Sequence, residues 1–304
     1  MAAAAATRSR PPRSRRLLGR HPVGYLFITP YVVFLVAIFA YPLGFAVYMS
    51  FHEYFFAAPG AEVDRPFVGL DNFATALSDP TFRRAMLNVV IFIAINVPLT
   101  VFLGLLLATA LNAAIPFRTF FRASYFIPYV TASVAVIGVW LWLFSSNGLV
   151  NAMLGPLAPD PSWLVNRFWA MPLIALFATW KQLGFYVLLY LAALQNIPKE
   201  LYEAAEVDGA GPVRRFFAVT VPGVRPTTTL VVIAATIIGA NFFTEPYLLT
   251  GGGGPAGASV SPVLLMYQEG IEQGDAGYAA AIGVMLALGV MAVSLVNRYL
   301  LERS

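Results

Sequence analysis

The chain has 304 residues, of which 59% are apolar and only 11% are charged, and its formal net charge is +4. A soluble domain carries about 25% charged residues, so this composition favours the lipid bilayer as the solvent. The chain contains no cysteine, which excludes a disulfide scaffold, a zinc–thiolate site and a cysteine nucleophile.

The first 22 residues form a basic tail that is rich in alanine, arginine and proline and is expected to be disordered. Residues 23–51 follow as an apolar run, roughly twice as long as the core of a signal peptide and without a small-x-small cleavage site. We therefore expect this run to be retained as the first transmembrane helix. The arginines of the tail are Arg8, Arg10, Arg13, Arg15, Arg16 and Arg20.

Six stretches have the roughly 20 mainly apolar residues that a transmembrane helix needs. The sequence therefore predicts an all-α membrane protein with six spans in a single domain, residues 23–304. The predicted spans are residues 23–51, 85–111, 123–144, 171–194, 227–249 and 279–301.

Lysine and arginine in the connecting loops predict the orientation, because cytoplasmic loops carry an excess of basic residues. With six spans both termini lie on the same side. If that side is cytoplasmic, it holds most of the basic residues, which predicts a multi-pass membrane protein with both termini in the cytoplasm. The cytoplasmic set comprises the tail arginines and Arg118, Arg122, Lys199, Arg214, Arg215, Arg225, Arg298 and Arg303, against Arg65, Arg83, Arg84 and Arg167 outside.

Several site classes are disfavoured by the residues themselves. The glycines at 251–254 are followed by proline and alanine rather than by Lys-Ser/Thr, so they predict an external turn and not a nucleotide cradle. His21 and His52 bracket the first span and cannot share a metal. The acids are scattered, which argues against a paired-carboxylate active site, and the basic residues flank apolar runs, which argues against nucleic acid.

Residues 196–226 are the exception to the apolar pattern, because this stretch is too polar to cross a membrane. Pro198 suits the start of a helix and Gly209 is a natural stop, which predicts one helix over residues 198–208. Pro212 restarts the chain, and Pro222 is expected to interrupt a second helix after about ten residues.

Both short helices have a face with helical spacing. A stripe of small residues permits close approach, and bulky aromatic residues can anchor, so the pair predicts a docking element for lipid or for a protein partner; spacing alone leaves the two open. The stripes are Leu201, Ala204, Ala205 and Asp208, and Val213, Phe216, Phe217 and Thr220.

The segment LYEAAEVDGAGPVRRFFAVTVPGVRP resembles the EAA signature of the permease subunits of binding-protein-dependent ABC importers. PFVGLDNF, FRASYFIPYV, LYLAALQNIP and EPYLLTGGGGP resemble its carbohydrate branch, specifically the first permease of the maltose and glycerol-phosphate type. The resemblance implies a cytoplasmic coupling loop between spans four and five that contacts the ATPase. Its ATPase-coupling residues are Glu203, Ala204, Ala205, Asp208, Gly209 and Pro222.

The same resemblance implies the partners: a second permease subunit, two cytoplasmic ATPase subunits and an extracellular solute-binding protein, besides membrane lipid. The chain has no Walker motif, so we expect no cofactor bound directly, ATP hydrolysis by a partner and no enzymatic activity of its own. Di- or oligosaccharide is the expected cargo. Glycerol phosphate and an autonomous secondary transporter are the alternatives, although no inverted repeat supports the latter.

Polar residues inside the predicted fourth and fifth spans are the candidates for substrate binding, because such residues are costly in a membrane. Interhelical hydrogen bonds and ion pairing are the structural alternative. Phe242 and Phe243 stand where the maltose-type pattern has polar residues, which indicates a different sugar or fewer contacts. The candidates are Gln182, Tyr186 and Asn241, which the resemblance places at the sugar cavity, and Lys181 and Glu245.

Overall fold

The computed structural model describes residues 23–57, 63–113 and 116–303, and the predicted basic tail lies outside them. The chain divides into two compact units, Met1–Tyr48 and Met49–Ser304. Within the described residues all regular structure is helical, and only isolated bridges, such as His52 with Phe67, join extended segments. This agrees with the predicted all-α class.

The described part of the first unit is one long helical run. It begins with α2 (Val23–Leu35), widens into the π-helical segment η1 (Val36–Ala40) and continues as α3 (Tyr41–Ser50), whose end belongs to the second unit. The π-turn directly precedes Pro42, which has no amide hydrogen to donate, and such turns are how helices accommodate a proline. The run is long and apolar enough to cross a membrane.

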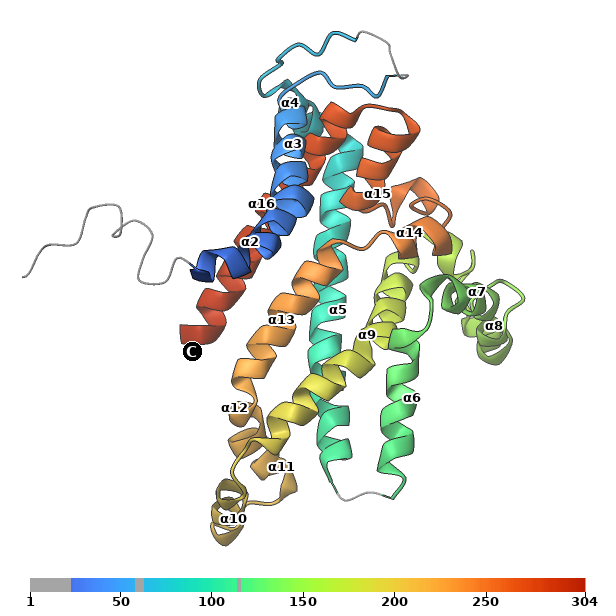
Figure 1. Cartoon of the computed structure of the whole chain (residues 1–304). Coiled ribbons are helices and arrows are strands. Elements are labelled where there is room, and N and C mark those ends of the chain that lie inside the picture. The colour runs from blue at the N-terminus through green and yellow to red at the C-terminus, as the bar shows by residue number, and fades with distance from the viewer. Residues whose placement is uncertain (1–22, 58–62, 114–115, 304) are drawn as a thin grey trace, which may run out of the picture. The chain divides into compact units, whose positions relative to one another are not determined.

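Three long helices dominate the second unit: α5 (Pro80–Asn112), α9 (Ala170–Gln195) and α16 (Ala276–Arg303) (Figure 1). Asp79 caps α5, because its carboxylate accepts hydrogen bonds from the amides of Thr81 (2.8 Å) and Phe82 (3.3 Å). These three helices correspond to the predicted second, fourth and sixth spans, and each has the length and hydropathy of a span.

The predicted third span is not one straight helix. Residues of this stretch form α6 (Arg118–Val130) and α7 (Ser133–Leu143), whose axes differ by 98°. The break follows Pro128, and the Thr131 hydroxyl donates to the Ile127 carbonyl at 2.7 Å, which closes the end of α6. The predicted third span is therefore a bent pair of helices, which passes as a span only when both are taken together. The segments α8 (Leu149–Leu154), η2 (Gly155–Leu157) and η3 (Trp163–Val165) follow.

The predicted fifth span is also interrupted. Helix α13 (Arg225–Ala240) ends at Asn241, and a separate short helix, α14 (Thr244–Leu249), follows. Phe242 is buried between them and stacks on Phe92 of α5, with ring centroids 4.4 Å apart. Burying this ring turns the chain out of the helix. In the described part of the chain, four helices are long and apolar enough to span a membrane, or up to six if each bent pair counts as one span.

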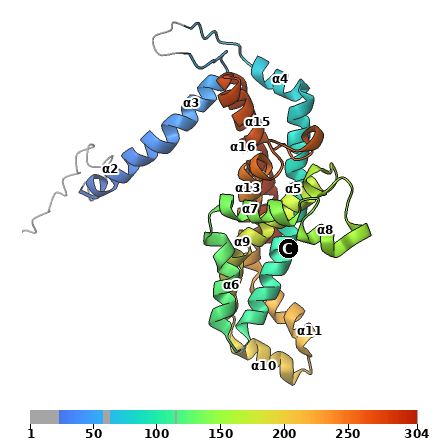
Figure 2. The same ribbon diagram turned by 90° about the vertical axis from the view of Figure 1, so that its right-hand side faces the viewer.

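Short helices gather at the two ends of the second unit. At one end lie α4 (Asp71–Ser78) and α15 (Pro262–Tyr267), with the segments η5 (Pro255–Gly257) and η6 (Gln268–Glu272). At the opposite end, α10 (Lys199–Val207), α11 (Pro212–Arg215), η4 (Phe216–Thr220) and α12 (Val221–Gly223) connect α9 to α13 (Figures 1 and 2). The last turn of α5 and the first turn of α6 lie at this same end.

Candidate functional site

The loop between α9 and α13 contains two short helices, as the sequence predicts, and the first ends with the expected glycine. Gly209 has a φ of +74°, its amide donates to the Glu206 carbonyl at 3.0 Å, and the amide of Ala210 donates to the Ala205 carbonyl at 2.9 Å. These two bonds form a Schellman motif, which satisfies the last carbonyls of α10. Glycine is favoured at this position because the left-handed conformation is costly for a residue with a Cβ atom.

The second helix runs further than predicted. Pro222 does not interrupt it, because the π-helical turn Phe216–Thr220 precedes the proline and the helix continues to Gly223. The break lies at Val224, where the axis turns by 68° into α13. Val224 is completely buried, so the turn is fixed against the core of the second unit.

The inner face of the loop is anchored to the long helices. The hydroxyls of Tyr202 and Thr220 are hydrogen-bonded at 3.0 Å, and Thr220 is buried. Gly223 lies so close to Ile197 that a Cβ atom there would be 2.7 Å from the isoleucine Cδ1. These two contacts join the arms of the loop, and Tyr202 and Phe216 pack on the buried cluster formed by residues of α5, α9 and α13. Sequence reasoning missed this anchor, although Tyr202 is the one aromatic residue of α10 and could have marked its inward face.

The outer face of the loop is open. Glu203, Ala204 and Asp208 are exposed, and Ala205 is partly buried. The predicted stripe of the second helix is divided: Phe216 packs on the core and Thr220 is buried, whereas Val213 and Phe217 point outward. Exposed apolar side chains thus lie beside exposed acids, which is the composition of a contact surface. They are Leu201 (52% exposed), Val207 (88%), Val213 (72%) and Phe217 (66%).

An exposed ion pair links the two halves of the loop. Arg215 Nη1 lies 3.0 Å from Glu206 Oε2, and both groups are accessible to solvent. An exposed pair of this kind contributes at most about 1 kcal/mol. It therefore orients α10 and α11 without locking them, and it leaves Glu203, a candidate residue, without a basic partner among the described residues.

Two of the candidate substrate residues lie on the middle of α9. Gln182 is partly buried and makes no hydrogen bond to another described residue, so its amide is available to a ligand. Tyr186 is 1% exposed, and its hydroxyl is buried without a hydrogen-bond partner in the described part of the chain. An unpaired buried hydroxyl costs about 1–3 kcal/mol, so this group invites a partner that the isolated chain does not supply.

Lys181 and Glu245 come from different elements but are close enough to interact electrostatically. Helix α14, which holds Glu245, packs on α9. No ion pair within 4.0 Å joins the two residues in the described part of the chain.

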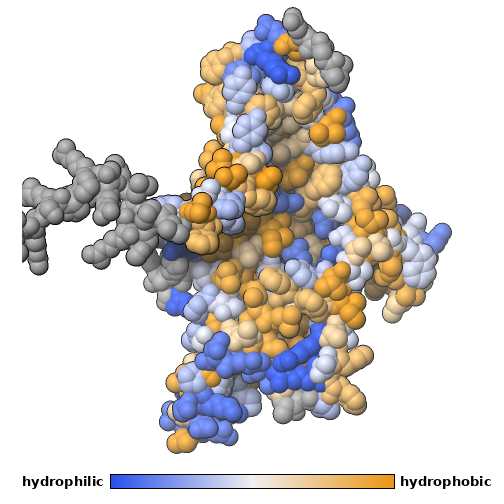
Figure 3. Space-filling model, in the orientation of Figure 1, coloured by the Kyte–Doolittle hydropathy of each residue, from blue (hydrophilic) through white to orange (hydrophobic). Residues whose placement is uncertain are grey.

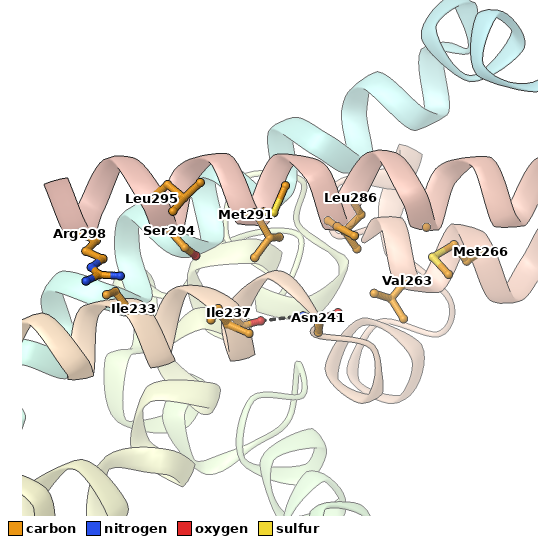
Figure 4. Close-up of a pocket in the computed structure, with 13 residues that line it drawn as sticks. Ile233, Ile237, Asn241, Val263, Met266, Leu286, Met291, Ser294, Leu295 and Arg298 are labelled. Atoms are coloured by element: carbon orange, nitrogen blue, oxygen red, sulfur yellow. Dashed lines mark hydrogen bonds between the residues drawn. The ribbon is translucent and has the colours of Figure 1, made fainter. Parts of the chain in front are cut away.

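Asn241 lies apart from the other candidates. It faces a cavity of about 670 Å³ between α13, α15 and α16, and its amide donates to the Ile237 carbonyl at 2.7 Å (Figure 4). The lining contains none of the other candidate residues. It is mainly aliphatic and consists of Ile233, Ile237, Asn241, Val263, Met266, Gly283, Leu286, Ala287, Val290, Met291, Ser294, Leu295 and Arg298.

Polar residues of α5 hold neighbouring segments in place. Asn96 donates to Thr179 of α9 at 2.8 Å. Asn88 instead binds the glycine-rich loop, because its amide donates to the carbonyls of Gly257 (3.0 Å) and Val260 (2.8 Å). In this loop the amides of residues 252–254 donate to carbonyls of the chain itself, so it is a closed turn and not an anion cradle.

The comparison with known proteins agrees with this architecture. The family described as "Binding-protein-dependent transport system inner membrane component" matches residues 16–304. The arabinooligosaccharides transport system permease protein of Halalkalibacterium halodurans is 36% identical over 91% of this chain and 87% of its own length. The sulfoquinovosyl glycerol permease protein of Agrobacterium fabrum is 33% identical over 92% and 90%, respectively.

Further similarity extends to a permease for a phosphorylated compound and to a solved structure. The sn-glycerol-3-phosphate permease protein of Yersinia pestis is 31% identical over 92% of this chain and 94% of its own length. A chain of a bacterial alginate ABC transporter, solved with an alginate pentasaccharide-bound periplasmic protein, shares the fold with a TM-score of 0.77 at 23% identity, over 96% and 98% of the two chains. The chain thus belongs to the inner membrane components of binding-protein-dependent transport systems and is a multi-pass transport subunit.

Proposed function

We infer that the chain is the permease subunit of an ATP-driven importer of a carbohydrate, with a di- or oligosaccharide as cargo. Relatives named for arabinooligosaccharides, lactose and sulfoquinovosyl glycerol support this substrate class. A relative named for sn-glycerol-3-phosphate makes glycerol phosphate the alternative. A phosphate would favour a strongly cationic site, whereas Lys181 is a single cation with the acid Glu245 near it, so the sugars named for the relatives fit better.

The two-faced construction of residues 196–226 is the main support for coupling to an ATPase subunit. The outer face, with Glu203 and Ala204, is open, while the inner face packs through Tyr202 and Phe216 on the core cluster that contains residues of α9 and α13. A displacement of the outer face by a closing ATPase dimer would therefore reach both helices. Coupling between two sites requires such a shared element with two arrangements.

The cargo would meet polar groups on the same two helices and on α14. Gln182 and Tyr186 of α9 would bond sugar hydroxyls, and Asn241 at the end of α13 would add an amide once the helices rearrange. Lys181 and Glu245 would bind hydroxyls as a charge-balanced pair. The buried, unpaired hydroxyl of Tyr186 supports this assignment, because a ligand hydroxyl would satisfy it.

The complete importer would also contain a second permease subunit, two cytoplasmic ATPase subunits and an extracellular solute-binding protein. ATP would act through the ATPase subunits, and this chain would bind no cofactor directly. The subunit would lie in the bacterial cell membrane with both termini and the loop 196–226 in the cytoplasm. The basic residues at the start of α6 and in this loop support that orientation.

Uptake of labelled sugar into proteoliposomes tests the transporter class. Vesicles with all subunits and the binding protein should import sugar when ATP is present on the ATPase side, and should not import it with a proton gradient alone. Import by this subunit alone, driven by a proton gradient without ATP, would establish a secondary transporter and contradict the proposal.

A further inference from the structure

The start of α6 combines two arginines with exposed aromatic rings. Arg118 and Arg122 are four residues apart, so they lie on the same face of the helix, one turn from each other. Around them, the rings of Phe117, Phe120 and Phe121 are 79%, 67% and 40% exposed. Phe117 also has a φ of +58°, a left-handed conformation that costs a bulky residue about 1–2 kcal/mol.

Both arginines lack a partner in the part of the chain that the structure describes. Each is partly buried, its Nε atom is buried without a hydrogen-bond partner, and neither belongs to an ion pair. A guanidinium group presents its donors as a planar fork that matches a phosphate. Two such groups at one helical turn form a local cationic site whose counter-charge must come from outside the described residues.

The surroundings indicate a lipid phosphate rather than an acidic protein surface. The start of α6 lies at the end of the second unit that carries α10, α11 and α12 (Figures 1 and 2), and a hydrophilic patch over this part of α6 borders hydrophobic surface (Figure 3). A soluble acidic partner would pair the arginines but would leave Phe117 and Phe120 in water. The membrane interface satisfies both kinds of group at once, with rings in the acyl region and cations at the headgroups.

We propose that Arg118 and Arg122, together with Phe117, Phe120 and Phe121, bind the phosphate of an anionic phospholipid in the cytoplasmic leaflet. The arginines hold the headgroup, and the rings lie among its acyl chains and those of its neighbours. Each basic residue near an anionic membrane surface raises lipid affinity by roughly fivefold, so the pair should favour an anionic over a zwitterionic lipid by roughly 25-fold. Bound lipid would fix the start of α6, which packs along α9.

Lipid titration of the purified full-length chain tests the site. The melting temperature in detergent is followed while phosphatidylglycerol, phosphatidylcholine or inorganic phosphate is added. We expect phosphatidylglycerol to raise the melting temperature at a concentration roughly 25-fold below the concentration of phosphatidylcholine that gives the same rise. The Arg118→Gln/Arg122→Gln variant should lose this preference, and Arg214→Gln, which removes an exposed cation of the loop, should keep it.

Several results would overturn the proposal. They are equal responses to both lipids, a full response to inorganic phosphate alone, or a glutamine variant that retains the preference. A glutamine variant that keeps its lipid preference but no longer co-purifies with the ATPase subunit would assign the arginines to a protein contact instead. If the glutamine variant does not fold, Arg118→Lys/Arg122→Lys retains the charge and should raise the half-saturating concentration by only a few-fold. A lysine variant with an unchanged half-saturating concentration, or with no lipid preference, would contradict a phosphate fork.

Discussion

Gly184 lies where α6 crosses α9, two residues from Gln182 and Tyr186, and it leaves no room for a side chain. A Cβ atom at this position would meet the Tyr125 carbonyl and would lie 2.8 Å from the Cα atom of Phe126, whereas ordinary contacts begin at 3.4 Å. The Gly184→Ala substitution must therefore move the α6 backbone by at least 0.6 Å, the difference between these distances. Backbone cannot rotate away as a flexible side chain can.

Overpacking of this kind costs about 3 kcal/mol at the upper end of its range, and the better helix propensity of alanine returns about 1 kcal/mol. A net loss of about 2 kcal/mol should lower the melting temperature by about 4–8 °C and reduce sugar uptake, because Gln182 and Tyr186 shift with α9. Gly138→Ala in α7 is the matched control, since nothing lies within 4 Å of its Cβ position, and it should melt at or above the wild-type temperature. A Gly184→Ala protein that melts no lower than wild type would refute the close crossing of α6 and α9.

Three further substitutions test other parts of the structure. Gly209→Ala should destabilise the end of α10 by about 1–2 kcal/mol through the left-handed φ of this position alone, and Gly209→Asn should destabilise it less. The urea midpoint for amide exchange in α10 measures both effects, and equal midpoints would refute the Schellman motif at Gly209. Asn88→Leu removes both hydrogen bonds to the glycine-rich loop and should speed amide exchange in residues 250–260 by roughly 5- to 30-fold. Unchanged exchange would contradict the stabilisation of this loop by Asn88. Burial, reinforced by Asp275 and Asp79, raises the pKa of the Glu269 carboxyl above its ordinary 4.5. The group therefore stabilises the fold fully below about pH 4.5 and loses this contribution as pH rises through its folded pKa. Glu269→Gln should accordingly raise the melting temperature near pH 7 and change it little below about pH 4, and a decrease near pH 7 would contradict the burial of this group.

The long helices and the loop stop were predictable because their causes are local. Continuous apolar runs identify α5, α9 and α16, and Gly209 ends α10 through its own backbone preference. The breaks at Thr131 and Phe242 were not predictable from apolar composition. The second depends on the stacking of Phe242 on Phe92, a residue 150 positions away in the chain, and no window of local sequence contains that contact.

The candidate residues also divide into those whose positions follow from local sequence and those whose positions depend on distant contacts. Helical spacing identified the small-residue stripe of α10, whereas the family resemblance singled out Glu203, whose side chain is exposed. The burial of Thr220 and the outward position of Phe217 depend on the π-turn Phe216–Thr220 and on the hydroxyl of Tyr202. Family resemblance predicts Asn241 and Gln182 at one sugar cavity. In this structure Asn241 lines the cavity between α13, α15 and α16, whose lining does not include Gln182, so their joint role stays a prediction.

The central claim is that the exposed face of α10 transmits ATPase closure to this subunit, and the most direct measurement is ATPase association and coupled transport in the Glu203→Arg variant. Glu200→Arg, another exposed glutamate of the same helix, is the control. We predict that Glu203→Arg loses at least tenfold in sugar transported per ATP hydrolysed, or fails to co-purify with the ATPase subunit, while its melting temperature stays within about 2 °C of wild type. A variant that associates and transports as wild type does would contradict the account.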